Sequence, residues 1–165
     1  MIPEQRARLR DLLMSIEYAM FTTRSRNGEL ISRPLQTLQV DDDGAIWFFT
    51  SAASSKVDDV GCDARVNLAY AAPARKAFVA VTGTAQLVVD RAKIAELWKP
   101  AQTIFFPLGR DDPTLVLLKV TPDTARWWDG RESMLGRLLK FGRAVLRHEA
   151  SDLGHCEDID VRRTR

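Results

Sequence analysis

Cysteine and histidine are scarce in this chain of 165 residues, which has two of each. Cys62 and Cys156 stand far apart and form no CxxC pair, so the sequence predicts neither a disulfide framework nor a structural zinc site. The histidines, His148 and His155, lie near the C-terminus close to Cys156 and Glu157. Their spacing matches no established set of metal ligands, and we expect no metal site.

Long apolar runs and a strong charge imbalance are also missing. No stretch is long enough to span a bilayer, and the charged N-terminus does not resemble a signal peptide. The net charge of +2 is too small by itself to indicate nucleic-acid binding. We therefore expect a cytoplasmic protein that binds neither membranes nor nucleic acids. The hydrophobic content of 45% predicts a globular protein with a real core.

The chain does contain many short strand-like segments separated by turns. An amphipathic helix begins near Pro3 and carries apolar residues at three- and four-residue steps up to Ile16. Turn residues at Asn27-Gly28 and over 41–44 separate the first strands, and Gly83 marks a bend, bulge or close approach in a later one. Six or seven strands with few helices favour an antiparallel barrel over a parallel sheet.

The segment WFFTSAASSKVDDVG, residues 47–61, passes from a strand into a helix. Ser55 as N-cap with Asp58 three residues later predicts a capping box. Lys56 then falls in the first turn, where a cation opposes the helix dipole by roughly 0.3 to 1 kcal/mol. Either an anion binds there, or Lys56 is solvated or paired with Asp59.

Hydroxyl groups and a second cation favour the anion. Ser54, Ser55, Lys56 and the backbone N–H groups of the helix start could together hold a phosphate. Arg33 precedes Pro34, which favours an extended backbone at an edge or irregular strand. A guanidinium at such a position could grip phosphate oxygens, although most single arginines are ordinary surface residues.

Five segments together resemble the general stress protein branch of the pyridoxamine-phosphate-oxidase-like flavin-binding split barrels. They are SRPL (32–35), WFFTSAASSKV (47–57), RVNLAYA (65–71), VTGTAQLVVDRAKIAELWKP (81–100) and FPLGRDDPTLVLLKVTPDTARWWD (106–129). The resemblance implies a mainly β protein with a six-stranded antiparallel split β-barrel over residues 1–130. It also implies a homodimer with FMN at the subunit interface, FAD being the alternative flavin.

The same resemblance implies a set of flavin-binding residues. Arg33 and Lys56 would hold the flavin phosphate, and Thr50 would meet the polar edge of the ring. Three aromatic residues of the set would approach the flavin from the partner subunit, namely Trp98, Phe106 and Trp128. The full set is Ser32, Arg33, Phe49, Thr50, Ser54, Ser55, Lys56, Trp98, Phe106 and Trp128.

Alternation along a strand limits two aromatic pairs in this region. Phe48 and Phe49 point to opposite faces, so only one of them can meet a ring, and the same holds for Trp127 and Trp128. We expect Phe49 and Trp128 to face the flavin.

The sequence departs from true pyridoxamine-phosphate oxidases. Their C-terminal Arg-x-His substrate clamp is missing, since the corresponding end reads ARWWDGRES, which argues against vitamin B6 oxidation. No catalytic acid, base or nucleophile stands out. We expect an FMN-dependent oxidoreductase of unknown substrate that takes electrons from a reduced nicotinamide or flavin, or a flavin storage, carrier or sensor protein without turnover.

Residues 131–165 differ in character from the preceding chain. Apolar and basic residues alternate at helical spacing over 131–147, which predicts a basic amphipathic helix. The last residues, 151–165, are polar, and we expect them to be loosely held.

Overall fold

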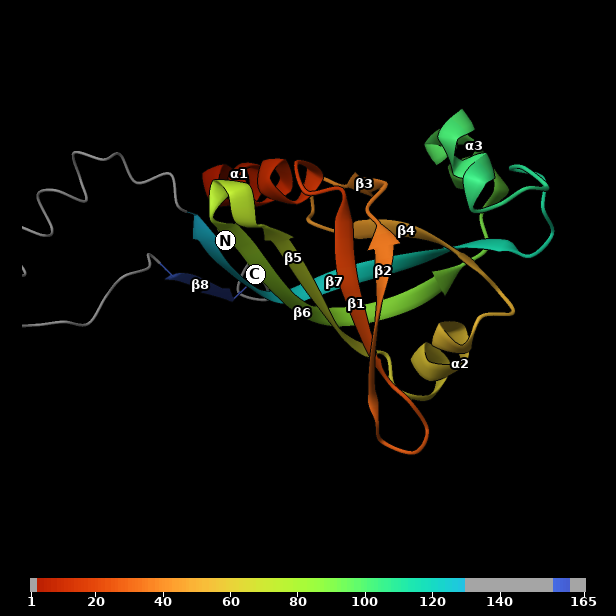
Figure 1. Ribbon diagram of the computed structural model, residues 1–165, viewed down its shortest axis with the longest axis horizontal. Coiled ribbons are helices and arrows are strands. Elements are labelled where there is room, and N and C mark those ends of the chain that lie inside the picture. Colours follow the sequence, from red (N-terminus) through yellow and green to blue (C-terminus); the bar gives the residue numbers. More distant parts are fainter. Residues whose placement is uncertain (1–2, 130–155, 161–165) are drawn as a thin grey trace, which may run out of the picture.

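The computed structural model describes residues 3–129 and 156–160, which form one sheet with helices around it (Figure 1). In chain order the elements are α1 (Pro3–Met14), β1 (Tyr18–Arg24), β2 (Leu30–Gln36), β3 (Gln39–Val40), β4 (Ile46–Ser51), α2 (Ser55–Cys62), β5 (Arg65–Ala72), η1 (Pro73–Arg75), β6 (Ala77–Val88), α3 (Arg91–Leu97), η2 (Pro100–Ile104), β7 (Leu115–Asp129) and β8 (Cys156–Asp160).

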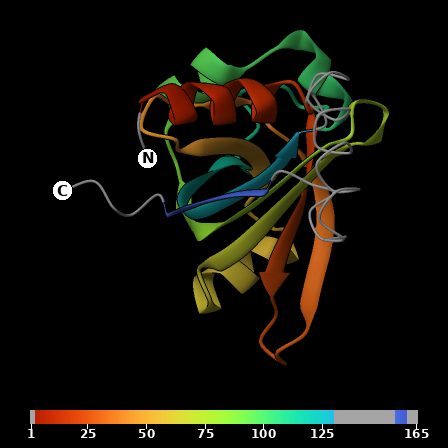
Figure 2. The same ribbon diagram turned by 90° about the vertical axis from the view of Figure 1, so that its left-hand side faces the viewer.

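The strands form a single antiparallel sheet in the order β2-β1-β5-β6-β7-β4-β3, and β8 pairs with β7. Figure 2 shows this sheet curled into a half barrel with α1 lying across its top. The predicted mainly β split barrel is confirmed. Its six long strands are β1, β2, β4, β5, β6 and β7, and the short β3 and β8 are additions that the sequence did not indicate.

The curled sheet does not close on itself. β2 stands at one end of the strand order and β4 with β3 at the other, and no hydrogen-bonded ladder joins β2 to β4 in the described part of the chain. We call this gap between β2 and β4 the seam. Backbone N–H and C=O groups facing it have no ladder partner across it, which leaves them available to a ligand.

The predicted turns are present. Gly28 and Gly44 have positive φ values of 89° and 92°, which a residue without a Cβ adopts readily. At Gly83 the register between β6 and β7 shifts, and a Cβ there would collide with the carbonyl oxygen of Thr121. The expected bulge and close approach therefore occur together at one glycine.

Two hydrophobic clusters lie on the two faces of β4. Phe48 belongs to the main core inside the barrel, which also contains Phe21 and Leu13 of α1. Phe49 belongs to a second cluster with Ile94 and other residues of the α3 side. The predicted division between Phe48 and Phe49 is confirmed, because successive side chains of a strand point to opposite faces.

The expectation of a loosely held C-terminal tail is wrong for Cys156–Asp160, which forms β8. β4 pairs only with the first half of β7, from Leu115 to Val120, so the edge of its second half is open. β8 pairs there, opposite Thr124 to Trp128, and backbone hydrogen bonds do not require an apolar sequence. The helix predicted over 131–147 and both histidines lie outside the described residues. No helix of the described part is long and apolar enough to cross a membrane.

Candidate functional site

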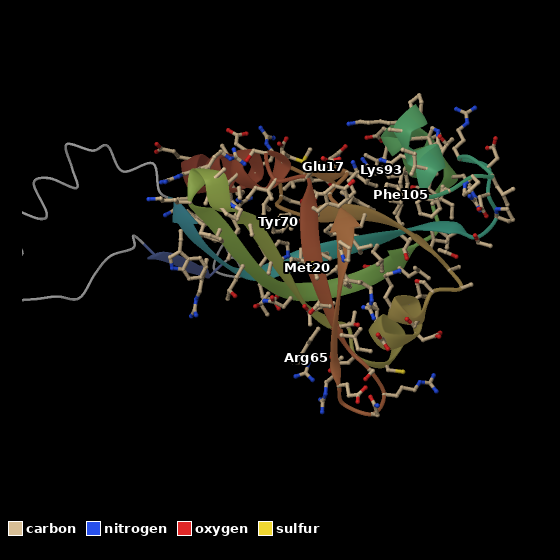
Figure 3. All side chains as sticks on the ribbon, in the orientation of Figure 1. Glu17, Met20, Arg65, Tyr70, Lys93 and Phe105 are labelled. Carbon is tan, nitrogen blue, oxygen red and sulfur yellow. The ribbon has the colours of Figure 1, made fainter. Side chains whose placement is uncertain are left out.

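A pocket of about 260 Å³ opens at the seam. Both ends of the sheet contribute to it, and the turns before α2 and after α3 complete it, so we call it the seam pocket. Its lining residues are Tyr18, Pro34, Leu35, Gln36, Leu38, Phe49, Thr50, Ser51, Ser54, Lys56, Gln102, Phe105 and Phe106. Phe105 is labelled in Figure 3, on the same side of the sheet as Glu17.

Three polar side chains form a compact group at one end of the pocket. The Lys56 ammonium lies 3.0 Å from Ser54 Oγ and 3.2 Å from Thr50 Oγ1, and the two hydroxyl oxygens are 3.1 Å apart. We call these residues the lysine–hydroxyl cluster. Thr50 ends the buried part of β4 and Lys56 lies in the first turn of α2, so the strand-to-helix turn folds the three groups together.

Lys56 carries a charge that its neighbours do not neutralise. The side chain is half-buried, and no carboxylate lies within 4 Å of its ammonium among the residues that the structure describes. Burial lowers the pKa of Lys56 below its ordinary value of 10.5, and the nearby positive charge of Arg33 lowers this pKa further. A buried cation next to a second cation is costly unless an anion joins them, so the cluster is suited to a bound anion.

The predicted helix start is wrong by one residue. Ser54, and not Ser55, is the N-cap of α2, and its side chain makes no capping bond to the helix. Its hydroxyl faces Thr50 and Lys56 instead. Ser55 is exposed and does not line the pocket. Because Ser54 makes no capping bond, the first backbone N–H groups of the helix have no side-chain cap.

Arg33 does not line the pocket but lies behind Lys56. Its Nη1 donates to Thr23 Oγ1 at 2.7 Å, and its Nη2 lies 3.3 Å from Asp59 Oδ2. Asp59 thus pairs with Arg33, and the alternative in which it pairs with Lys56 is wrong. Ser32 points away from this site, since its exposed hydroxyl contacts Thr22 Oγ1.

The aromatic residues of the predicted set divide into two groups. Phe49 contacts Phe106 edge-on at 6.0 Å between ring centroids and Trp98 at 5.8 Å, all within one chain. Phe106 lines the pocket, whereas Trp98 packs behind Phe49. Trp128 lies at the opposite end of β7 from the seam pocket and is 36% exposed.

Two glutamines of the pocket were not anticipated. Gln102 of η2 is buried and donates its Nε2 to Gln36 Oε1 of β2 at 3.1 Å, and Gln36 donates to Glu17 Oε1 at 2.8 Å. This chain of bonds ties η2 to the seam. A buried glutamine in a short 3₁₀ turn has no periodic signal, so the sequence did not reveal it.

Comparison with known families assigns the chain to one of them. Residues 4–152 match the family described as pyridoxamine 5'-phosphate oxidase like. The chain belongs to this family. The matched residues run from α1 through the end of β7, so the match of this pyridoxamine 5'-phosphate oxidase-like chain spans the whole barrel.

The proteins that resemble this chain include general stress proteins. The general stress FMN/FAD binding protein of Xanthomonas citri is 27% identical, with a TM-score of 0.67, covering 81% of this chain and 94% of that chain. A structure assigned as general stress protein 26 of Jannaschia sp. CCS1 shares the fold at 24% identity, with a TM-score of 0.73 and coverage of 96% and 99%. Protein bli-3 of Neurospora crassa is 24% identical over 161 residues, covering 92% of this chain and 77% of its own length.

Proposed function

We propose that the protein binds FMN in the seam pocket, with the flavin phosphate on the lysine–hydroxyl cluster. The observation that carries this proposal is the half-buried Lys56 ammonium, which contacts two hydroxyls and no carboxylate among the described residues. A phosphate would neutralise Lys56 and accept hydrogen bonds from Thr50 and Ser54. The name of the similar Xanthomonas citri protein, which states FMN/FAD binding, supports the same assignment.

The remaining pocket residues suit a flat aromatic ring. Phe49 and Phe106 offer apolar faces, and Gln36 and Gln102 offer amide groups. Open backbone groups along the seam could meet the polar edge of the ring. A bound flavin supplies hydride or electron transfer, and the residues of this chain orient it and exclude water.

We further propose that the protein is a homodimer. The outer face of the sheet carries large exposed apolar side chains on neighbouring strands: Tyr18 at 43%, Met20 at 44%, Phe78 at 41% and Trp128 at 36% exposure. Phe78 lies directly opposite Trp128, and Met20 opposite Ala69 of β5. Such a patch is typical of a protein interface.

Tyr18 links this outer face to the seam pocket, which it also lines. A second copy docked on the outer face would therefore cover the mouth of the pocket. Trp128, which is remote from the pocket of its own chain, would reach the flavin from the partner as the resemblance implies. Phe78→Arg should convert the dimer to a monomer in light scattering, whereas Arg75→Ala, on another exposed residue, should not.

We propose an FMN-dependent oxidoreductase of the cytoplasm, with flavin storage or transport as the second candidate. Tyr18 and Lys56 are the titratable residues that line the described pocket, so no carboxylate, imidazole or thiol there could assist a substrate. This composition fits hydride transfer by the flavin itself, and it also fits storage. Anaerobic addition of NADH or NADPH separates the two, because bleaching of the visible flavin absorbance indicates an oxidoreductase.

The binding proposal has a direct test. Titration of the flavin-free protein with FMN and riboflavin should give tighter binding of FMN, because riboflavin lacks the phosphate. Equal affinities, or no binding of either flavin, would contradict the proposal. Chromatography of the flavin released on denaturation distinguishes FMN from FAD.

A further inference from the structure

Arg33 is held by two buried side chains from two other elements. Thr23 of β1 is 1% exposed and Asp59 of α2 is 6% exposed. Besides accepting from Arg33, Thr23 donates its hydroxyl to Asp59 Oδ2 at 2.7 Å. The three residues thus close a ring of hydrogen bonds, which we call the Arg33 triad.

The triad restricts an otherwise mobile side chain. β2 is the edge strand at the seam, and an arginine on an edge strand can adopt many rotamers. Thr23 Oγ1 accepts from Nη1 and the adjacent Asp59 Oδ2 accepts from Nη2, and these two bonds hold both arms of the guanidinium in place. Thr23 and Asp59 use two of its five N–H groups, so donors remain for another partner.

The triad also lies beside the proposed phosphate site. Asp59 and Lys56 are three residues apart on α2, which makes them neighbours on one helix face. Arg33 contacts Asp59 from that side, and its charge is one cause of the lowered pKa of Lys56. The two cations of the site therefore belong to adjoining hydrogen-bond groups.

We propose that Thr23 and Asp59 are positioning residues that aim the Arg33 guanidinium at the flavin phosphate. This inference rests on the proposed function, since it assumes that the phosphate binds next to Lys56. Neither residue needs to touch the flavin. The triad would make FMN preferred over riboflavin through the orientation of Arg33.

A charge effect of Asp59 would act in the opposite direction. A carboxylate near a phosphate repels it, so removal of the Asp59 charge alone should tighten FMN binding. Loss of the position of Arg33 should weaken FMN binding. Asp59→Leu removes the acceptor oxygens together with the charge, whereas Asn would keep an oxygen that can still accept from Arg33 and Thr23. The sign of the change in Asp59→Leu therefore distinguishes positioning from simple charge neutralisation.

The experiment compares FMN and riboflavin affinities of the full-length protein in matched variants. Thr23→Val removes both hydrogen bonds without changing charge or shape, and Thr23→Ser keeps the hydroxyl. The controls are Thr84→Val on exposed β6 and Asp58→Asn on the exposed side of α2. We expect Thr23→Val and Asp59→Leu to weaken FMN about tenfold and riboflavin less than about twofold, and Thr23→Ser and both controls to behave as wild type.

Two outcomes would overturn the inference. An unchanged ratio of FMN to riboflavin affinity in Thr23→Val, or tighter FMN binding in Asp59→Leu, rejects positioning. Where the ratio is unchanged because both flavins lose affinity equally, the triad merely holds α2 on the sheet. Lys56→Ala, measured in parallel, separates the two proposals: if it also leaves the ratio unchanged, the proposed phosphate site itself is wrong. If Thr23→Val does not fold, the FMN and riboflavin affinities of Asp59→Leu decide the question.

Discussion

Basic side chains lie near both ends of α2, but their surroundings differ. At the end of the helix, Asp63 accepts from Arg65 Nε at 2.9 Å and Nη2 at 2.7 Å, and Arg26 Nε lies 3.1 Å from Cys62 Sγ. These arginines are exposed, and Figure 3 shows Arg65 near the β1–β2 hairpin. At the start of the helix, Lys56 is half-buried among hydroxyls.

The contrast shows that a count of cations does not identify an anion site. Two arginines, Arg26 and Arg65, lie near the C-terminal end of α2. Arg65 already has a carboxylate partner, and both arginines are exposed to solvent. The N-terminal end of α2 has fewer positive side chains. Burial nevertheless removes part of the hydration of Lys56, and no carboxylate pairs with it in the described structure. Unbalanced charge combined with burial is the informative feature.

Transferring a carboxylate to the start of α2 should have the largest effect. Ser54→Asp places an anion beside Lys56, as Asp63 lies beside Arg65. At an effective dielectric constant of about 20, repulsion at 4 Å should weaken FMN by about 4 kcal/mol. Riboflavin affinity and the thermal midpoint should not fall, because Asp is also a good N-cap. Calorimetric titration measures the affinities, and undiminished FMN binding would refute the comparison.

Removal of either cation of the site should have the next largest effect. We expect Lys56→Ala and Arg33→Ala each to weaken FMN by about 1.5 to 3 kcal/mol, the range for a hydrogen bond to a charged group. Riboflavin should be affected much less. Arg65→Ala, which removes the same charge at the other end of α2, is the control and should bind FMN as the wild type does.

FMN affinity should begin to fall at a lower pH than it would if Lys56 had the ordinary pKa of a lysine. A bound phosphate raises the pKa of Lys56, so affinity is complete below the pKa of the free protein and declines as pH rises through it. That pKa lies below 10.5, because burial and Arg33 lower it. Titrations of FMN at increasing pH above 7 should show the decline. Riboflavin, and FMN with Lys56→Ala, should not show the same decline.

Asp63 should affect acid stability and not flavin binding. Its hydrogen bonds with Arg65 lower the pKa of Asp63 from 3.8 to about 2. A lowered carboxylate pKa stabilises the folded state above pH 3.8, and this contribution is lost as pH falls from there toward 2. Asp63→Asn should flatten the stability curve over this interval by a small amount, since Asp63 is only partly buried and its partner Arg65 is exposed. Urea unfolding at several pH values tests this, and a changed FMN affinity would count against the comparison.

The site was predictable where chemistry follows from local spacing. Lys56, Ser54 and Thr50 lie within seven residues of one strand-to-helix turn, and the structure brings them together. The Ser54 N-cap was missed by one residue because its hydroxyl bonds to the side chains of Thr50 and Lys56 and does not cap a backbone N–H group of the helix. The partner of Arg33 was missed because Asp59 is 26 residues away on another element.

Turn residues and alternating apolar residues were enough to predict the six long strands but not the short β3 and β8, because a turn and a pleat are determined by neighbouring residues. They could not locate the seam, because its position depends on the order of the seven strands in the sheet, which differs from their order in the chain. Nor could they indicate that η2 closes the pocket through Gln102, since that contact joins segments 66 residues apart. Local sequence thus specified the elements and the cations, whereas their burial and their partners depend on packing between distant segments.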